Sequence, residues 1–250
     1  MIEFYHSMGI SSYELFQVIL CALGIGMAKT GLGGIGLLVV PIMAGIFGPK
    51  ESTGILLIIL ILADIFGVGF YHRHAEINKL IQLAPSTLLG ILIGVLVGDR
   101  IDAYQFRFVM GTVVIIGAVL MTFQPNNKNN ERVSFFYSYT VGSLAGFSTM
   151  VGNAAGPIMT IYFLYIGFQK NKFIGTTAWF FLLVNIFKVP FHMFFWKTID
   201  LSIILFDLSL FPVIIFGALL GVYIVKRIPE KPYRIILILS VFLSTAKLFI

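Results

Sequence analysis

The sequence predicts an all-α integral membrane protein with about ten membrane segments, arranged as two inverted repeats of five segments. Three observations support this fold class. The 250 residues are 58% hydrophobic and only 11% charged, whereas soluble domains are roughly 25% charged. Apolar stretches near the roughly 20 residues needed to cross a bilayer recur along the chain. Glycine-rich breaks interrupt corresponding short stretches in the two halves, which predicts short hairpins near the membrane centre.

Ten apolar segments are expected in order along the chain. They cover residues 13–28, 32–48, 52–71, 80–98, 103–123, 133–150, 154–168, 173–196, 202–225 and 233–250. The short pairs around the two breaks are either two spans each or hairpins that return without crossing. The polar stretch 124–132 predicts a cytoplasmic loop between a first repeat, residues 1–123, and a second, inverted repeat, residues 133–250.

The two halves share a pattern of proline, glycine and polar positions. Pro41 matches Pro157, Asp64 matches Asn185, and Pro85, Gly90 and Gly94 match Pro212, Gly217 and Gly221. Five spans, or three spans with a returning hairpin, are an odd number per repeat. The second half is therefore expected to be inverted, as in many secondary transporters.

Lysine and arginine in the loops predict the orientation. One side carries Arg73, Lys79, Lys128, Arg132, Lys170, Lys172, Lys226, Arg227, Lys231 and Arg234, and the other carries Lys50, Arg100, Arg107, Lys197 and Lys247. The side richer in positive charge is expected to be cytoplasmic. We therefore predict a multi-pass protein of the cell (inner) membrane with both termini outside the cytoplasm.

The first break, KTGLGGIGLLVVP from Lys29 to Pro41, places a lysine and several glycines inside an apolar region, and the second, GSLAGFSTMVGNAAGP, runs from Gly142 to Pro157. Glycine weakens a helix interior by about 1 kcal/mol relative to alanine, and a lysine at mid-membrane costs roughly 2.5–3.5 kcal/mol. Helices that start inside the membrane present unpaired N–H groups and a partial positive charge, which bind anions.

The breaks therefore predict a two-part anion site, with a lysine in the first break only. Its candidate residues are Lys29, Thr30, Gly31, Gly33, Gly34, Ser148, Thr149, Gly152, Asn153 and Gly156. The alternative is a tight helix–helix turn in which Lys29 extends to an interface.

Three further polar residues lie deep in apolar segments and are candidates for coupling or gating. Asp64 and its repeat counterpart Asn185 are expected to meet near the centre, and Lys188 follows Asn185 on the same helical face. An Asp64–Lys188 ion pair is expected, either as a gate or proton relay or as a static pair that neutralises two buried charges.

Enzymatic chemistry has no support in the sequence. The single cysteine excludes CxxC sites, no catalytic residues or metal ligands are predicted, and no GxxxxGK[ST] motif is present. We expect no cofactor and no nucleic-acid partner. The expected partners are a small anionic substrate, the lipid bilayer and a coupling proton or ion, and a homodimer is left open.

KTGLGGIGLLVVP, followed by Pro49, Lys50 and Asp64, resembles the sulfite exporter TauE/SafE family, and GNAAGPIMTIYFL with FQKNKFIGTTAWFFLLVNIFKVPF is similar to a subgroup of it. The resemblance covers about residues 15–225. It implies two inverted halves with hairpins meeting at the membrane centre, and transport of small anions such as sulfite or organosulfonates without ATP. The second break lacks the glycine run of the first, so the two half-sites are chemically unequal.

Together these features predict a secondary transporter, an exporter of a small anion such as a sulfur oxyanion or organosulfonate, working by alternating access. An anion channel of the same fold is the first alternative. The remaining alternatives are an intramembrane enzyme and an assembly or sensor subunit.

Overall fold

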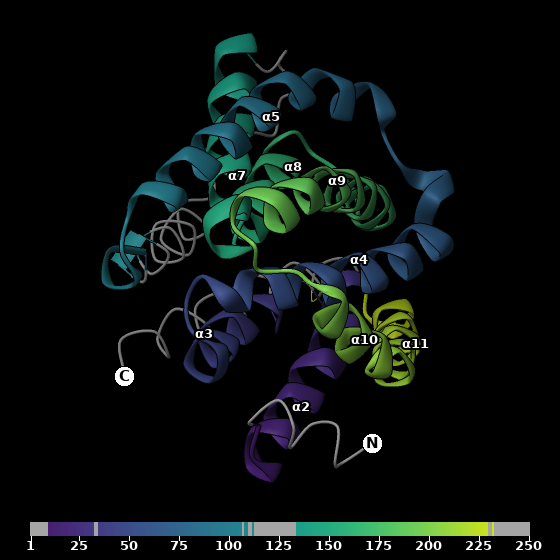
Figure 1. Cartoon of the computed structure of the whole chain (residues 1–250). Coiled ribbons are helices and arrows are strands. Elements are labelled where there is room, and N and C mark those ends of the chain that lie inside the picture. The colour runs from purple at the N-terminus through teal and green to yellow at the C-terminus, as the bar shows by residue number, and fades with distance from the viewer. Residues whose placement is uncertain are drawn as a thin grey trace.

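Helices form throughout the part of the chain that the computed structural model describes, which is residues 10–32, 35–106, 108–109, 112, 134–229 and 232 (Figure 1). The helices are α2 (Ser12–Lys29), α3 (Ile35–Phe47), α4 (Glu51–Tyr71), η1 (His72–His74), α5 (Ile77–Arg100), α7 (Phe135–Gly152), α8 (Gly156–Tyr165), α9 (Lys170–Pro190), η2 (Phe191–Phe195), α10 (Leu201–Ser209) and α11 (Phe211–Arg227). No strand occurs among these residues, which confirms the all-α prediction. Most of the expected segment 103–123, the loop 124–132 and the segment 233–250 lie outside the described residues.

Local sequence explains where the helices around the two breaks begin and end. Ser11 and Glu14 form a capping box at the start of α2, with the Ser11 amide 2.8 Å from the Glu14 carboxylate. At the end of α7, Asn153 adopts a left-handed conformation with φ of 51°. Asparagine tolerates this conformation better than most residues. The turn lets α8 start three residues later, with Pro157 in its first turn.

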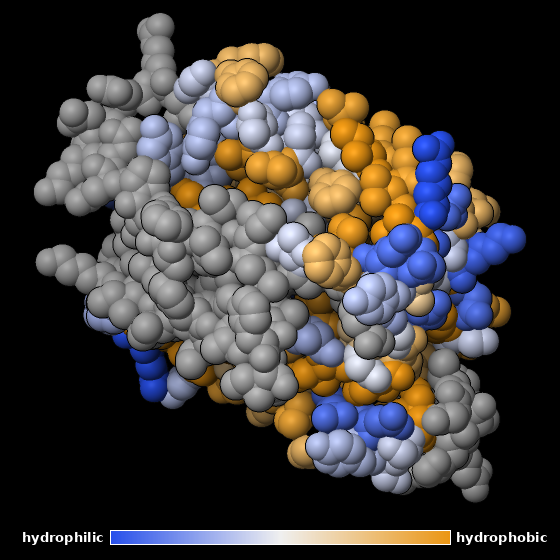
Figure 2. Space-filling model, turned by 90° about the vertical axis from the view of Figure 1, so that its left-hand side faces the viewer, coloured by the Kyte–Doolittle hydropathy of each residue, from blue (hydrophilic) through white to orange (hydrophobic). Residues whose placement is uncertain are grey.

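Four described helices are long and apolar enough to cross a membrane, and the bent pair of α10 and α11 is a fifth candidate. Large apolar side chains are exposed on the outer faces of α2, α5 and α9. On the face shown in Figure 2, hydrophobic side chains cover much of the upper right, whereas hydrophilic side chains gather at the right edge and low on the face. Soluble monomers rarely expose large contiguous apolar patches. These surfaces fit contact with lipid.

The expected segment 202–225 is a bent pair of helices and not one straight helix, because α10 and α11 meet at Leu210 with a bend of 48°. Pro212 explains the break, since proline lacks an N–H and clashes with the carbonyl four residues earlier. Its counterpart Pro85 lies inside the continuous helix α5.

Glycines bring two helix pairs into close contact in the same way. A side chain at Gly146 of α7 would collide with the Thr87 carbonyl of α5 and reach within 3.0 Å of the Ile91 nitrogen. A side chain at Gly26 of α2 would likewise collide with the Ile214 carbonyl of α11 and reach within 2.8 Å of the Ala218 nitrogen. Helix α5 of the first half thus packs on α7 of the second, and α11 of the second half packs on α2 of the first.

The third helices of the two halves, α4 and α9, pack on each other through the middle of the molecule (Figure 1). They run in opposite directions, since Gly175 near the start of α9 faces the Tyr71 carbonyl at the end of α4. Asp64 and Asn185 meet where the two helices cross. This crossing positions the candidate site.

Candidate functional site

A cavity lies at the crossing, between the end of α2 and the starts of α3 and α8. The space in it that the centre of a water molecule can occupy is about 80 Å³. A single water molecule needs roughly 10–15 Å³ of such space. The cavity therefore has room for a small anion. It is lined by Ile25, Ala28, Lys29, Gly31, Gly36, Leu60, Thr149, Asn153, Gly156, Pro157, Thr160, Phe173, Ile174, Thr177, Ala178, Phe181 and Asn185.

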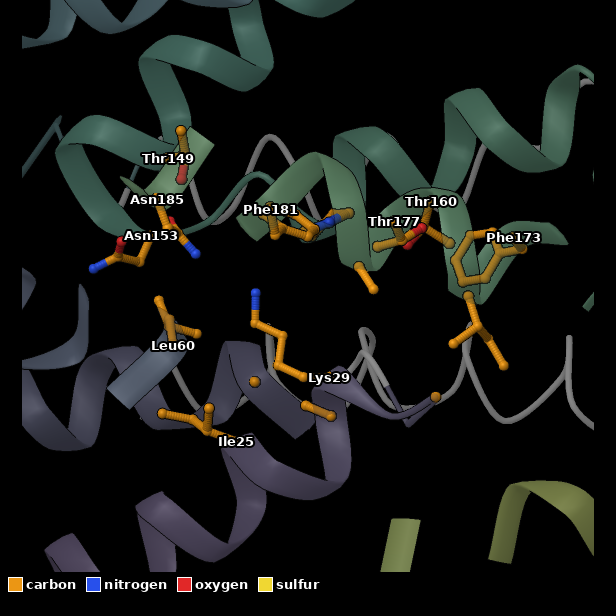
Figure 3. Close-up of a pocket in the computed structure, with 17 residues that line it drawn as sticks. Ile25, Lys29, Leu60, Thr149, Asn153, Thr160, Phe173, Thr177, Phe181 and Asn185 are labelled. Atoms are coloured by element: carbon orange, nitrogen blue, oxygen red, sulfur yellow. The ribbon is translucent and has the colours of Figure 1, made fainter. Parts of the chain in front are cut away.

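Lys29 reaches into the middle of this cavity from the last turn of α2 (Figure 3). Its ammonium lies 2.9 Å from the carboxylate of Asp64 and 4.1 Å from the centre of the Phe181 ring. The Lys29 side chain is 12% exposed, whereas that of Asp64 is fully buried. Lys29 is thus the charged group that an occupant of the cavity meets, with Asp64 behind it.

The expected Asp64–Lys188 ion pair is wrong, because Asp64 pairs with Lys29. Gly67 explains why Asp64 pairs with Lys29. A methyl group at position 67 would lie 2.7 Å from the Lys29 carbonyl oxygen, so only glycine lets α4 approach the end of α2 this closely. Asn185 separates Asp64 from Lys188. Its amide nitrogen donates to Asp64 at 2.8 Å, and its amide oxygen lies 3.4 Å from the Lys188 ammonium.

Lys188 lies on α9, but it hydrogen-bonds residues of the second break. Its ammonium donates to the Thr149 carbonyl at 2.8 Å, the Thr149 hydroxyl at 3.2 Å and the Asn153 side-chain oxygen at 2.6 Å. A cation is favourable there because the last carbonyls of a helix carry partial negative charge. The expectation of a lysine at the first break only therefore understated the positive charge.

The structure brings only some of the predicted site residues to the cavity. Lys29, Gly31, Thr149, Asn153, Gly156 and Asn185 line the cavity, while Asp64 and Lys188 lie directly behind lining residues. Thr30, Ser148 and Gly152 are buried away from it, and Gly33 and Gly34 lie outside the described residues. The Thr30 hydroxyl donates to the carbonyls of Gly26 and Ala218, so it joins α2 to α11.

The two lysines, the carboxylate and the helix start give the site its electrostatic character. Lys29 and Lys188 bring two amino groups to the site against the one carboxylate of Asp64. The first turn of α8, at Gly156 and Pro157, also lines the cavity and adds the partial positive charge of a helix N-terminus. These groups favour an anionic occupant.

The sequence model of the family described as Sulfite exporter TauE/SafE matches residues 18–248. The chain belongs to the sulfite exporter TauE/SafE family. It is accordingly a multi-pass membrane transporter of sulfite or anion type, and the earlier resemblance is confirmed. No curated protein and no solved structure matches the chain.

In this TauE/SafE chain the two half-sites differ in where they carry their lysine. Gly26 of α2 and Gly146 of α7 make matching contacts and lie 120 residues apart. The same offset makes Thr149 the counterpart of Lys29. The Asp64–Asn185 match relates α4 to α9 by 121 residues, which makes Gly67 the counterpart of Lys188. Each half therefore supplies one lysine, but from a different helix.

The lining residues that sequence reasoning missed include Phe173, Thr177 and Phe181 of α9 and Thr160 of α8. One signal was present, since Thr177, Phe181 and Asn185 are spaced by four residues and share a helix face. Nothing comparable marks Thr160, which reaches the cavity because α8 packs between α7 and α9.

Proposed function

We propose that the protein is a secondary transporter that exports a small anion, such as a sulfur oxyanion or organosulfonate like sulfite, by alternating access. The observation that carries this proposal is the ammonium of Lys29, which is partly exposed in a cavity at the centre of the fold. An ionisable residue at membrane depth is a strong functional indicator.

The anion would bind between Lys29 and the first turn of α8. One of the three N–H donors of Lys29 faces Asp64, which leaves two for a ligand. Gly156, in the first turn of α8, has open space where a side chain would stand, so an anion can approach the backbone there.

On α9 the residues that line the cavity all lie on one side of the crossing with α4, which supports alternating access. The α9 residues that line it run from Phe173, in the first turn, to Asn185, and none lies beyond Asn185 in the described part of the chain. This is the end near Lys170 and Lys172, on the side predicted to be cytoplasmic. The cavity would accordingly correspond to an inward-facing state.

The opposite end is closed by specific contacts. Asn153 donates from its amide to the Thr53 carbonyl at 3.1 Å, and Gly54 packs directly against Thr198. Thr198 in turn lies 2.8 Å from the ring nitrogen of the buried His192. A site closed on one side supports a transporter over the alternative of an anion channel.

The matching contacts of α5 with α7 and of α11 with α2 support the inverted repeat. Two related halves of opposite orientation supply the equivalent open and closed arrangements that alternating access needs. The inner-membrane location, the outward termini, the coupling proton or ion and the homodimer stay predictions.

The proposal is tested with purified protein in liposomes, by measuring sulfite flux and anion-dependent thermal stabilisation. Lys29→Ala is expected to weaken anion binding about tenfold or more, because hydrogen bonds from charged donors contribute roughly 1.5–3 kcal/mol. The control Lys226→Ala, at the exposed end of α11, should bind as the wild type. Unchanged affinity in Lys29→Ala would contradict the proposal, and non-saturating flux would favour the channel.

A further inference from the structure

His192 is a titratable side chain at the closed end of the site, and the anion binding described above does not use it. The residue lies in η2, directly after α9, and is fully buried. Its Nδ1 lies 2.8 Å from the Thr198 hydroxyl, whereas its Nε2 has no hydrogen-bond partner in the described part of the chain. Buried polar atoms almost always have a partner, because leaving one unpaired is unfavourable.

The imidazole belongs to a group of contacts that closes the end of the site predicted to face outside. Gly54 of α4 packs on Thr198, since a side chain at position 54 would lie 2.6 Å from the Thr198 hydroxyl oxygen. The His192 ring also meets the Trp196 ring edge-on, with centroids 5.1 Å apart. Trp196 in turn donates from its indole nitrogen to the Val95 carbonyl of α5 at 3.2 Å. We call these contacts the outer gate, and parting them would expose the imidazole to water.

A protonated imidazole has no partner of opposite charge in this closed arrangement. The ionisable groups that act on it most directly are the amino groups of Lys188, one turn earlier on α9, and of Lys50, which precedes α4. No carboxylate of the described chain acts on it in the same way. The other charged residues of the surrounding segments are exposed to solvent, namely Glu51, Asp99, Arg100, Lys197 and Asp200. Burying an unpaired charge is unfavourable, so the closed gate requires a neutral His192.

We propose that His192 is a proton-binding site that controls the outer gate, neutral while the gate is closed and protonated when it opens. This inference rests on the proposed alternating access and assigns a proton-binding residue to it. A histidine in water takes up a proton near roughly pH 6.5. The open arrangement binds the additional proton, so a fall in external pH shifts the population toward it.

Trp196 provides the measurement, because its ring contacts that of His192. The chain has two tryptophans, so Trp179→Phe leaves Trp196 as the single fluorescent reporter. In this purified protein, a fall from about pH 8 to about pH 5.5, across the usual titration range of histidine, should shift the emission to longer wavelength as the indole meets water. Adding His192→Gln, which keeps a neutral hydrogen-bonding side chain near Thr198, should abolish the shift.

A second variant keeps the histidine itself. Thr198→Val removes the hydroxyl that stabilises the neutral imidazole in the closed gate, so the midpoint of the emission shift should move to higher pH. The matched controls are His72→Gln and His74→Gln, which lie exposed at the other end of the molecule and should leave the shift unchanged.

Cysteine labelling in sealed vesicles connects the proton to opening of the gate. In a Cys21→Ala background, Thr53→Cys should react faster from outside at the lower pH, when its rate is divided by that of the exposed Asp99→Cys. The division removes the intrinsic pH dependence of the thiol. His192→Gln should make this ratio independent of pH.

Three results would overturn the inference. The same emission shift in His192→Gln would assign the pH response to another group. Absence of a shift in protein that retains His192 would mean that the gate takes up no proton, and an unchanged labelling ratio would mean that the proton does not open it. Absence of sulfite flux and of anion-dependent stabilisation at every pH would instead count against the proposed transport function itself.

Discussion

At the scale of single residues, the Lys29–Asp64 pair links the cavity to the buried centre of the fold. A buried ion pair gains little net stability, but losing one partner costs about 3–5 kcal/mol because the other charge is left uncompensated. Asp64 has no contact with the cavity, whereas Lys29 lines it. A bound anion would therefore compete with the Asp64 carboxylate for the Lys29 ammonium.

Asp64→Asn tests this competition. The variant should unfold at a lower temperature than the wild type, because Lys29 loses its counter-charge. Anion binding should restore much of that loss, so the anion-induced rise in melting temperature should exceed that of the wild type. Thermal melting with and without sulfite measures both effects. A variant as stable as the wild type, with no larger anion-induced rise, would contradict the competition.

At the scale of helices, the close approach of α5 to α7 and of α2 to α11 depends on glycine. Small residues let helix backbones pack closely where lipid provides no hydrophobic driving force between helices. Gly146 and Gly26 each face backbone atoms of the partner helix, which cannot move aside as a flexible side chain would.

Gly146→Ala and Gly26→Ala are each expected to destabilise the protein by about 1–3 kcal/mol, as overpacking does. The matched controls are Gly45→Ala and Gly69→Ala, since these helical glycines have no neighbouring atom within 4 Å of an added methyl group. The controls should be neutral or stabilising by up to about 1 kcal/mol. Thermal or denaturant unfolding in detergent provides the comparison, and equal effects at all four positions would refute the packing role.

At the scale of the whole molecule, the central cavity extends toward the start of α9, and the contacts around Thr53 close the other end. Alternating access requires these two ends to exchange roles. The fold therefore predicts a sided pattern of accessibility that changes with substrate.

Cysteine labelling in sealed membrane vesicles measures that pattern. In a Cys21→Ala background, Thr177→Cys should react with an impermeant thiol reagent from the cytoplasmic side only. Thr53→Cys, at 1% exposed, should react slowly from both sides and faster from outside when substrate drives the outward-facing state. Two controls report the sides independently: Lys226→Cys should be labelled from the cytoplasmic side and Asp99→Cys from the outside. Labelling of Thr177→Cys from outside would contradict the predicted orientation.

Much of the fold could be predicted because membrane segments carry strong local signals. Length and hydropathy placed eight of the expected segments on observed helices or helix pairs, and the glycine-rich breaks located the cavity at Lys29 and Asn153. The bend at Leu210 could not be predicted in the same way, because Pro85 occupies the matching place in a continuous helix.

The sequence by itself determined that this chain is a membrane protein of the TauE/SafE family, with a positively charged break at its centre. Hydrophobicity, glycine and proline act locally, so their pattern along the chain is sufficient for this. Only the tertiary structure decided that Asp64 pairs with Lys29, that Lys188 holds the end of α7, and that Thr177 lines the cavity. Those contacts depend on how closely helices far apart in sequence approach one another, and that distance is set by packing at residues such as Gly67.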